Sequence, residues 1–504
     1  MNGKVYIVGA GPGDPELITL KGKRCIENSD VIIYDYLANP VLLKFASKNS
    51  EIIYVGKKGG HHTMPQNDIN NLIIKKAKKG LTITRLKGGD PFIFGRGGEE
   101  AEELVNAGIK FEIVPGITSA IAVPAYAGIP LTHRNFTSTL AFITGHEDPE
   151  KENSNIDWDY ISKGIGTIVF LMGVKNLGFI TEQLIKNGRS KDTPVALVQW
   201  GTTPKQLTVS GNLDNITQKV KEAGLKPPCI IIVGEVINLR DKLKWFENKP
   251  LFGKRILVTR ATEQASDLVN ILSNFGAECI EFPTIKIVTC EDKSLLDNAI
   301  DTIKDYEWLV FTSVNGVNFF FDRLFENGKD VRALYNIKTA SIGPATSKRL
   351  FDFGIKSDII PESYRAESII DAFKNIDVKG KKILLPRAKE ARPILPIELS
   401  KMGASVNEVI AYCTEIATED NTELLKKLES KEIDIVTFTS SSTVNNFKAL
   451  LPSEDFSYLM EGIKVASIGP VTSETALNLG FKVDITADIF TIEGLCDAIL
   501  KFYD

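Results

Sequence analysis

The second half of the chain repeats itself. The segment Gly-Lys-Arg-Ile-Leu-Val-Thr-Arg-Ala at 253–261 recurs 127 positions later as Gly-Lys-Lys-Ile-Leu-Leu-Pro-Arg-Ala at 380–388. Two more pairs keep nearly this offset: 310–313 with 437–440, and 341–347 with 467–473. Each copy is longer than the roughly 20 to 50 residues of a solenoid repeat, so we expect two copies of one α/β unit. Two such lobes would form a cleft suited to a small molecule, although a duplicated structural module names no ligand.

The first 240 residues predict another α/β arrangement. Short Val- and Ile-rich segments alternate with amphipathic stretches, which is typical of a fold with much parallel sheet. The expected helices include 66–79 and 99–107, and the expected strands are 5–8, 31–34, 52–55, 81–86, 111–114, 140–144, 167–172, 195–199 and 230–233. The charged segment 240–250 ends in proline and interrupts the alternation. We therefore expect domains over 1–245 and 253–504, joined by a linker over 246–252.

Composition and charge exclude several classes of function. Of the 504 residues, 43% are hydrophobic and 25% are charged, and the formal net charge of −4 gives no electrostatic footprint for nucleic acid. No apolar run approaches the roughly 20 residues of a membrane span. The N-terminal residues carry no signal-peptide pattern. We expect a cytoplasmic protein that binds neither nucleic acid nor membranes.

Cysteine and histidine spacing predicts no metal site. The six cysteines are scattered and form no Cys-x-x-Cys pair: Cys25, Cys229, Cys279, Cys290, Cys413 and Cys496. This pattern argues against a disulfide framework and against a thiolate zinc site. His61 and His62 could belong to a substrate-facing loop, whereas His133 and His146 lack the neighbours of a metal ligand set.

A glycine-rich stretch at 85–98 is the strongest sign of a ligand site. It reads Arg-Leu-Lys-Gly-Gly-Asp-Pro-Phe-Ile-Phe-Gly-Arg-Gly-Gly and follows an expected strand. Glycine lets a ligand approach the main chain closely, but it loses more entropy on folding than other residues. A glycine-rich surface loop is the alternative. We favour a ligand loop at the carboxyl end of the strand.

A second glycine turn follows the first expected strand, within 5–14. Gly9, Gly11 and Gly13 alternate with other residues, so they do not form the G-x-G-x-x-G pattern of dinucleotide sites. Asp14 in the turn would repel a pyrophosphate. The turn favours a cationic cofactor without phosphate, such as S-adenosylmethionine.

In order along the chain, these motifs and later ones resemble the uroporphyrinogen-III C-methyltransferases of the tetrapyrrole methylase family. The resemblance extends over about 3–245 and rests on the segments at 8–14, 85–100, 114–120, 128–134, 144–146 and 194–204. It implies two α/β subdomains, about 1–115 and 116–245, which enclose S-adenosyl-L-methionine in a trough and pair as a homodimer. It also implies transfer of two methyl groups to uroporphyrinogen III. The products would be S-adenosyl-L-homocysteine and precorrin-2, the precursor of siroheme and cobalamin.

The resemblance also implies roles for single residues. It places cofactor contacts at nine positions: Pro12, Gly88, Gly89, Asp90, Ile93, Thr118, Ser119, Met172 and Gly201. Asp35 and Lys57 match the proton acceptor and donor proposed for the family. Cations suited to the carboxylates of the substrate are Lys57, Arg85, Lys87, Arg96 and Arg134. As alternatives, Met172 could fill a gap in the core, and Thr118 with Ser119 could cap a helix.

The duplicated half resembles uroporphyrinogen-III synthase. The resemblance rests on the two-lobed repeat and on segments at 311–313, 438–440, 412–414 and 467–472. That family cyclises hydroxymethylbilane with inversion of one pyrrole ring and without a cofactor, mainly by orienting the substrate. Tyr412 would assist departure of the hydroxyl group, while Thr312, Ser313 and Thr472 would position the substrate. The alternatives are a helix cap at Thr312 and Ser313 and a packing role for Tyr412.

The synthase resemblance further implies that the chain crosses between the lobes near 286 and 413. Lobe one would then contain about 253–286 and 414–504, and lobe two about 287–413. Together, the two halves predict a bifunctional enzyme that makes uroporphyrinogen III and then methylates it. One alternative is a methylase of a later corrinoid intermediate joined to a non-catalytic two-lobed binding module. Another is a binding protein of the periplasmic type, against which the methylase motifs and the missing signal-peptide pattern argue.

Overall fold

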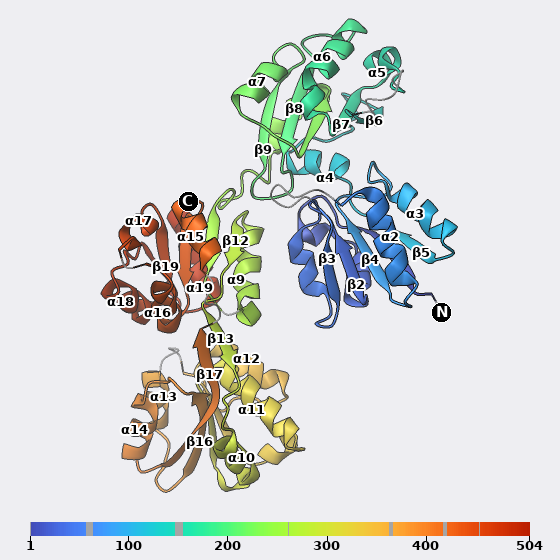
Figure 1. Cartoon of the computed structure of the whole chain (residues 1–504). Coiled ribbons are helices and arrows are strands. Elements are labelled where there is room, and N and C mark those ends of the chain that lie inside the picture. Colours follow the sequence, from blue (N-terminus) through green and yellow to red (C-terminus); the bar gives the residue numbers. More distant parts are fainter. Residues whose placement is uncertain are drawn as a thin grey trace. The chain divides into compact units, whose positions relative to one another are not determined.

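The computed structural model describes residues 2–56, 64–146, 155–260, 262–361, 366–416, 421–452 and 454–504. The chain forms two compact units: the first is Met1–Lys254 with Phe275–Glu278, and the second is Arg255–Asn274 with Cys279–Asp504. Each unit contains two five-stranded sheets flanked by helices (Figure 1). The predicted α/β fold class is confirmed, with two subdomains in the first unit and two lobes in the second. The residue limits assigned to domains and lobes from the sequence remain predictions.

The first subdomain has a parallel sheet in the order β3-β2-β4-β1-β5. Its strands are β1 (Lys4–Gly9), β2 (Val31–Tyr34), β3 (Glu51–Tyr54), β4 (Ile83–Lys87) and β5 (Lys110–Val114), and its helices are α1 (Leu20–Glu27), α2 (Gln66–Ala77) and α3 (Gly97–Asn106). Val5 and Ile7 of β1 lie in a core with α2 and α3, and Val8 lies in a second core with α1. Helices cover both faces, so β2 is apolar throughout, whereas β4 carries the buried polar residues Thr84, Arg85 and Lys87. Because all five strands run parallel, their carboxyl ends lie at one edge of the sheet.

Helix α4 (Ser119–Tyr126) leads into the second subdomain, whose mixed sheet has the order β6-β7-β10-β8-β9. Its strands are β6 (Leu140–Thr144), β7 (Thr167–Leu171), β8 (Pro194–Gln199), β9 (Leu207–Asn212) and β10 (Cys229–Val233), and its helices are α5 (Trp158–Gly164), α6 (Leu177–Lys186), α7 (Ile216–Glu222) and α8 (Arg240–Leu243). The sequence did not predict β9. This strand lies at the sheet edge with no buried residue, so it lacks the apolar pattern of the other strands.

Lobe one of the second unit carries a sheet in the order β12-β11-β18-β19-β20. Its strands are β11 (Arg255–Val258), β12 (Glu278–Glu281), β18 (Ile435–Phe438), β19 (Lys464–Ser467) and β20 (Ile485–Thr486), and its helices are α9 (Thr262–Asn274), α15 (Thr422–Glu429), α16 (Ser441–Ala449), α17 (Phe456–Met460), α18 (Pro470–Asn478) and α19 (Ile492–Tyr503). Strands β11, β18, β19 and β20 run parallel. Their carboxyl ends share one edge of this sheet.

Lobe two is inserted between β12 and β18, and its sheet has the order β13-β17-β16-β14-β15. Its strands are β13 (Ile285–Val288), β14 (Trp308–Phe311), β15 (Lys338–Ser341), β16 (Lys382–Ala388) and β17 (Ser405–Ile416), and its helices are α10 (Ser294–Asp301), α11 (Val314–Glu326), α12 (Pro344–Asp352), α13 (Ala366–Phe373) and α14 (Ile394–Lys401). Strands β13 and β17 pair antiparallel where the chain passes between the two lobes (Figure 1).

A disulfide joins Cys290 to Cys413, across 123 positions of sequence. The expectation from cysteine spacing was wrong for this pair. Cys413 lies opposite Val288 in the pairing of β13 with β17, and Cys290 lies two residues beyond the end of β13. The Cα atoms are 5.4 Å apart, within the usual range for a disulfide. Strand pairing thus joins two cysteines that no local motif connects.

Loss of this disulfide is expected to destabilise the second unit. Cys290→Ser should lower its free energy of unfolding by about 2–4 kcal/mol, because the cross-link restricts a long loop in the unfolded chain. Calorimetry of the full chain, with and without dithiothreitol, measures this change. Cys279→Ser is the control, since that thiol lies outside the disulfide and is half-buried. Equal unfolding profiles of the oxidised and reduced chains would contradict the prediction.

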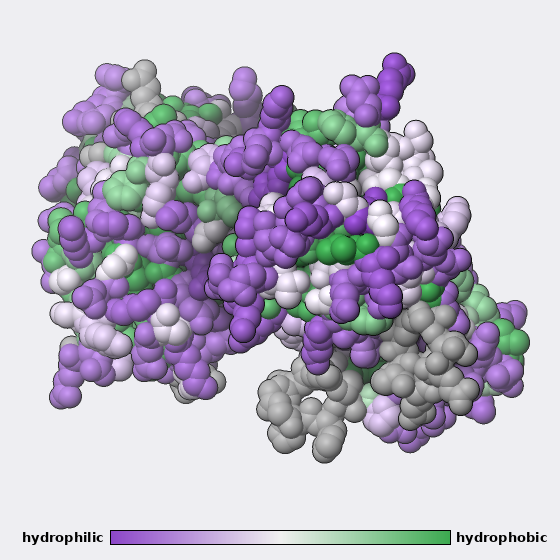
Figure 2. Space-filling model, turned by 90° about the horizontal axis from the view of Figure 1, so that it is seen from above, coloured by the Kyte–Doolittle hydropathy of each residue, from purple (hydrophilic) through white to green (hydrophobic). Residues whose placement is uncertain are grey.

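No helix in the described ranges is long and apolar enough to cross a membrane. On the face that Figure 2 shows, hydrophobic residues are scattered among hydrophilic ones. Single exposed apolar residues of this kind are normal for a protein surface.

Candidate functional site

Three glycine-containing loops meet at the carboxyl edge of the first sheet. The loops after β1 and β4 pair through Gly11 and Gly89, whose amides and carbonyls exchange hydrogen bonds of 3.2 and 2.7 Å. Gly116, after β5, packs so closely on them that a Cβ there would lie 2.7 Å from the Cα of Gly9. A Cβ at Gly9 would likewise lie 2.6 Å from the carbonyl oxygen of Gly89. Only glycine allows this backbone packing, so the edge presents main chain rather than side chains.

Asp90 connects two of these loops. Its Oδ1 accepts hydrogen bonds from the amides of Phe92 and Ile93, at 2.8 and 3.1 Å. Its Oδ2 accepts a 3.0 Å hydrogen bond from the amide of Gly116. Gly89, beside it, has φ +69°, and a Cβ there would make an ordinary contact with the amide nitrogen of Ser119 at 3.8 Å. The carboxylate therefore holds the glycine-rich loop against the loop that leads to α4.

The loop after β1 also reaches the second subdomain. The amide of Asp14 donates a 3.1 Å hydrogen bond to Thr202 Oγ1, and the hydroxyl of Tyr126 donates a 2.6 Å bond to Asp14 Oδ2. A Cβ at Gly13 would lie 3.3 Å from the carbonyl oxygen of Gly201. Pro12 lies within this same turn. The structure thus brings the glycine loops, α4 and the Trp200–Thr203 turn together where the two subdomains meet.

The remaining predicted cofactor residues lie at the start of α4, after β7 and in the glycine-rich loop. Thr118 is the N-cap of α4, and its Oγ1 accepts a hydrogen bond from the amide of Ala120, so the capping alternative is correct as a local description. Ser119 is the first residue of that helix. Met172 follows β7 with φ +58° and is 54% exposed, so it does not fill a core gap. Ile93 is also exposed.

A cluster of buried charges lies behind the site. Glu100 Oε1 receives the ammonium of Lys87 at 2.7 Å and Nε of Arg85 at 3.3 Å. Gln66 also donates to this oxygen, whereas Glu100 Oε2 has no hydrogen-bond partner among the described residues. Burial lowers the pKa of Lys87, with the charge of Arg85 acting in the same direction. Glu100 is a residue that sequence reasoning missed, although it closes the matched segment at 85–100.

Arg85 links the buried cluster to the predicted proton acceptor. Its Nη2 lies 3.2 Å from Asp35 Oδ2, and the other carboxylate oxygen accepts a hydrogen bond from the amide of Leu37. The Asp35 side chain is 28% exposed, whereas Arg85 and Lys87 are almost fully buried. The two cations therefore lie inside the subdomain, and their role as direct substrate ligands remains a prediction.

The other predicted cations of this unit are more open. Arg96 has φ +57° and forms an exposed ion pair of 2.6 Å with Glu99. Arg134 lies exposed in a turn before β6. Lys57 lies outside the described residues, as do His61 and His62. The structure therefore places Arg96 and Arg134 on the surface and Asp35 at its margin.

In the second unit, a cavity of about 440 Å³ lies between the two lobes. Thr312 follows β14 in lobe two, and Thr472 lies in the first turn of α18 in lobe one, so the cavity brings these two predicted residues together. The side chains from lobe two are those of Thr312, Ile342, Arg387, Arg392 and Leu395. Lobe one contributes Thr439, Ser440, Ser441, Ile468, Gly469, Pro470, Val471, Thr472 and Phe490. Sequence reasoning missed both arginines as site residues, although Arg387 lies in the repeated segment 380–388.

Tyr412 and Ser313 lie together beside Thr312. Their hydroxyl oxygens are 3.0 Å apart, and Ser313 also caps α11 by accepting the amide of Gly316. Tyr412 stacks on Phe319 at a centroid distance of 5.6 Å and is buried. Burial raises the pKa of Tyr412, which keeps its hydroxyl protonated at neutral pH. The packing alternative is thus correct for the ring, while the hydroxyl still has a polar partner.

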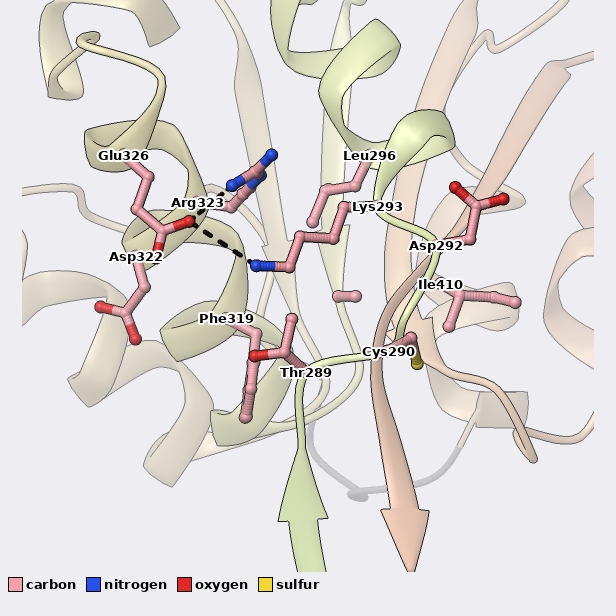
Figure 3. Close-up of a pocket in the computed structure, with 11 residues that line it drawn as sticks. Thr289, Cys290, Asp292, Lys293, Leu296, Phe319, Asp322, Arg323, Glu326 and Ile410 are labelled. Atoms are coloured by element: carbon pink, nitrogen blue, oxygen red, sulfur yellow. Dashed lines mark hydrogen bonds and ion pairs between the residues drawn. The ribbon is translucent and has the colours of Figure 1, made fainter.

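A second, smaller cavity of about 90 Å³ lies between α10, α11 and β17 (Figure 3). Its cations are already neutralised, because Glu326 pairs with Arg323 at 2.6 Å and with Lys293 at 3.9 Å. Cys290 at its margin is in the disulfide. In the described ranges, no group of three or more His, Cys, Asp or Glu residues could hold a metal ion.

Comparisons with known proteins follow the division into two units. The model of the tetrapyrrole (corrin/porphyrin) methylases matches residues 4–217, and that of uroporphyrinogen-III synthase HemD matches residues 266–497. The porphyrin biosynthesis protein HemD of Ruminiclostridium josui is 38% identical over 500 residues, which are 99% of this chain and 98% of that protein.

Two methyltransferases are similar over shorter stretches. The uroporphyrinogen-III C-methyltransferase of Bacillus subtilis (strain 168) is 46% identical over 347 residues, 69% of this chain and 70% of that protein. The S-adenosyl-L-methionine-dependent uroporphyrinogen III methyltransferase of Methanosarcina barkeri is 56% identical over 241 residues, 48% of this chain and 94% of that protein. One relative thus spans nearly the whole chain, and the two family models match separate halves.

Proposed function

The chain belongs to the family of porphyrin biosynthesis proteins that join a tetrapyrrole methylase to a uroporphyrinogen-III synthase, and we propose that its two units catalyse successive reactions. The second unit would cyclise hydroxymethylbilane to uroporphyrinogen III. The first would transfer two methyl groups to that product and release precorrin-2. The observation that carries this proposal is that one polypeptide contains two sites. One is the glycine-loop edge, where the loops of Gly11, Gly89 and Gly116 meet, and the other is the inter-lobe cleft lined by Thr312 and Thr472.

The glycine-loop edge fits S-adenosyl-L-methionine. Three loops present main chain where side chains would obstruct a ligand, and the exposed Met172 and Ile93 offer apolar contact. When bound, the cofactor supplies an electrophilic methyl group on a sulfonium. We assign its binding to the nine positions that the methylase resemblance implies: Pro12, Gly88, Gly89, Asp90, Ile93, Thr118, Ser119, Met172 and Gly201. Asp90 would act by holding two of the loops together.

Asp35 is the residue we propose to accept the proton that the methylated ring releases. Its carboxylate is fixed by Arg85 on one oxygen and by a backbone amide on the other, yet it remains accessible. A general base has to combine a fixed position with access to the substrate. We further assign proton donation to Lys57. The substrate carboxylates would be bound by the cations Arg96 and Arg134.

Asp35→Asn tests this role. We expect kcat for methyl transfer to uroporphyrinogen III to fall by about a hundredfold, because general base catalysis typically contributes that much or more. Binding of S-adenosyl-L-homocysteine, measured by calorimetry, should not change. Asp68→Asn is the matched control, since Asp68 is exposed in the first turn of α2. A normal kcat and an unchanged pH profile in Asp35→Asn would remove the proposed base.

The inter-lobe cleft fits a reaction controlled by orientation. Thr312 and Thr472 reach it from opposite lobes, and Tyr412 lies next to Ser313 with a protonated hydroxyl. A protonated phenol can donate to a departing hydroxyl group, while the cleft holds the ends of the linear substrate together. We propose these roles for Tyr412, Thr312, Ser313 and Thr472.

The decisive experiment supplies the purified chain with hydroxymethylbilane and S-adenosyl-L-methionine and identifies the product by mass spectrometry. Dimethylated precorrin-2 is expected. Uroporphyrin I alone would overturn the synthase assignment. Failure to methylate added uroporphyrinogen III would overturn the methylase assignment independently.

Three further properties belong to the same proposal. We propose that the chain pairs as a homodimer through its first unit, that it works in the cytoplasm, and that its product can serve cobalamin as well as siroheme synthesis. Light scattering of the full chain tests the first property, with a mass of one chain as the contrary result. The resemblance of the first 245 residues to the methylase family supports the first and third properties, and the second rests on the expectation from the N-terminal sequence pattern.

A further inference from the structure

Arg387 occupies an unusual position in the inter-lobe cleft. It lies near the carboxyl end of β16, at the edge of lobe two that faces lobe one, and it lines the cavity. The residue is only 5% exposed. Arginine is rarely buried to this extent unless its charge is matched.

The guanidinium of Arg387 is only partly satisfied by the protein. Nη2 donates a 2.5 Å hydrogen bond to the carbonyl oxygen of Arg392. Nη1 lies 3.5 Å from a carboxylate oxygen of Glu408, but neither Nη1 nor Nε has a hydrogen-bond partner among the described residues. Burial lowers the pKa of Arg387, against the charge of Glu408, which raises it. Because unmade hydrogen bonds of a buried charge are costly, a missing partner is expected.

The opposite wall of the cleft is also suited to an anion. Helices α16 and α18 both begin at the cavity, and each is nine residues long. The N-cap of α16 is Ser440, whereas the N-cap of α18 is Gly469, which offers no side-chain acceptor to the first amides. Helix N-termini carry partial positive charge. Arg387 and Arg392 are the charged residues of the described lining, which includes no carboxylate.

The internal repeat places a second arginine at the equivalent position of lobe one. Arg260 corresponds to Arg387 in the repeat. Arg260 lies two residues beyond the end of β11, and Arg387 is the second-last residue of β16. Burial also lowers the pKa of Arg260, against the charge of Asp267. An arginine therefore stands at the carboxyl edge of the first repeat strand in both lobes, although the residue before it changes from Thr259 to Pro386.

We propose that Arg387 is a substrate-binding residue of the second unit, whose guanidinium receives a carboxylate of the acidic tetrapyrrole in the cleft, with Nε as the donor that the described part of the chain leaves without a partner. This inference rests on the synthase function proposed above. A hydrogen bond from a guanidinium to a carboxylate is charge-assisted and stronger than a neutral one, so this contact would hold the substrate in position. The substrate anion thereby supplies the partner that the folded protein leaves missing.

The test measures the synthase reaction of the full chain with hydroxymethylbilane and without S-adenosyl-L-methionine. Arg387→Gln is expected to raise KM by about tenfold to a hundredfold, because it removes a charge-assisted contact, while kcat stays within about threefold. Arg387→Lys should recover part of the loss, since lysine keeps the charge but not the planar guanidinium. Arg332→Gln is the matched control, because Arg332 is exposed and pairs locally with Asp330.

A second measurement reads the same contact without catalysis. Calorimetric titration of the full chain with uroporphyrin III, which carries eight carboxylates, should show weaker binding to Arg387→Gln by tenfold or more, and no change for Arg332→Gln. Circular dichroism establishes that each variant is folded, with Arg387→Met as the replacement if Arg387→Gln is not. An inactive wild-type chain with this difference in binding would reject the synthase function only. Unchanged KM and unchanged binding in a folded variant would overturn the role of Arg387.

Discussion

Gly116→Ala is expected to reduce binding of S-adenosyl-L-homocysteine by at least a thousandfold, measured by calorimetry on the full chain. The added Cβ would lie 2.7 Å from the Cα of Gly9 and even closer to the carbonyl oxygen of Gly89. Backbone atoms cannot rotate away as a side chain can, so the loops after β1, β4 and β5 would have to separate. The hydrogen bond from Gly116 to Asp90 would be lost with them.

Gly98→Ala is the matched control for this change. Gly98 lies in the same glycine-rich segment, but it is in α3 and nothing lies within 4 Å of its Cβ position. Alanine favours a helix over glycine by about 1 kcal/mol, so this variant should bind normally and unfold at a slightly higher temperature. Normal binding by Gly116→Ala would show that the packed loops do not form the cofactor site.

Glu100→Gln is expected to lower the free energy of unfolding of the first unit by about 3–5 kcal/mol. Glu100 is the buried anion that Arg85 and Lys87 share, and its removal leaves two buried cations with Asp35 alone. Glutamine keeps the size of the side chain, so packing changes little. Urea unfolding of the full chain, followed by circular dichroism, measures the loss.

The neighbouring residue provides the control. Glu99→Gln removes an ion pair with Arg96 in which both side chains are more than half exposed, and such pairs contribute about 0–1 kcal/mol. Methyl transfer by Glu100→Gln should also weaken, because Arg85 would no longer hold Asp35 in one orientation. Similar stability of the two variants would mean that the buried cluster is not a structural requirement.

The sequence predicted most of the fold because its signals were local. The nine strands expected in the first unit are present, and the repeat at 127 positions correctly indicated two lobes. The glycine loops were also predictable, because Gly9 and Gly116 pack too closely on backbone for a side chain and the positive φ of Gly89 favours glycine.

Features that depend on distant partners could not be read from the sequence. Cys290 and Cys413 meet only because β13 pairs with β17. The burial of Arg85 and Lys87 depends on Glu100, which α3 carries back towards β4. Arg387 has a missing partner that only the folded cleft reveals. In each case the chemistry is set by tertiary neighbours and not by the local motif.

The insertion of lobe two into lobe one has a consequence for folding during synthesis on the ribosome. Every strand of lobe two is made by Ile416, so its sheet can close while the chain is still growing. Strand β11 must wait for β18, since the amide of Arg255 bonds to Asp434, 179 positions later. Such distant pairing is slow to form. The inner lobe is therefore expected to fold first, while the sheet of the outer lobe can close only after β18 has been synthesised.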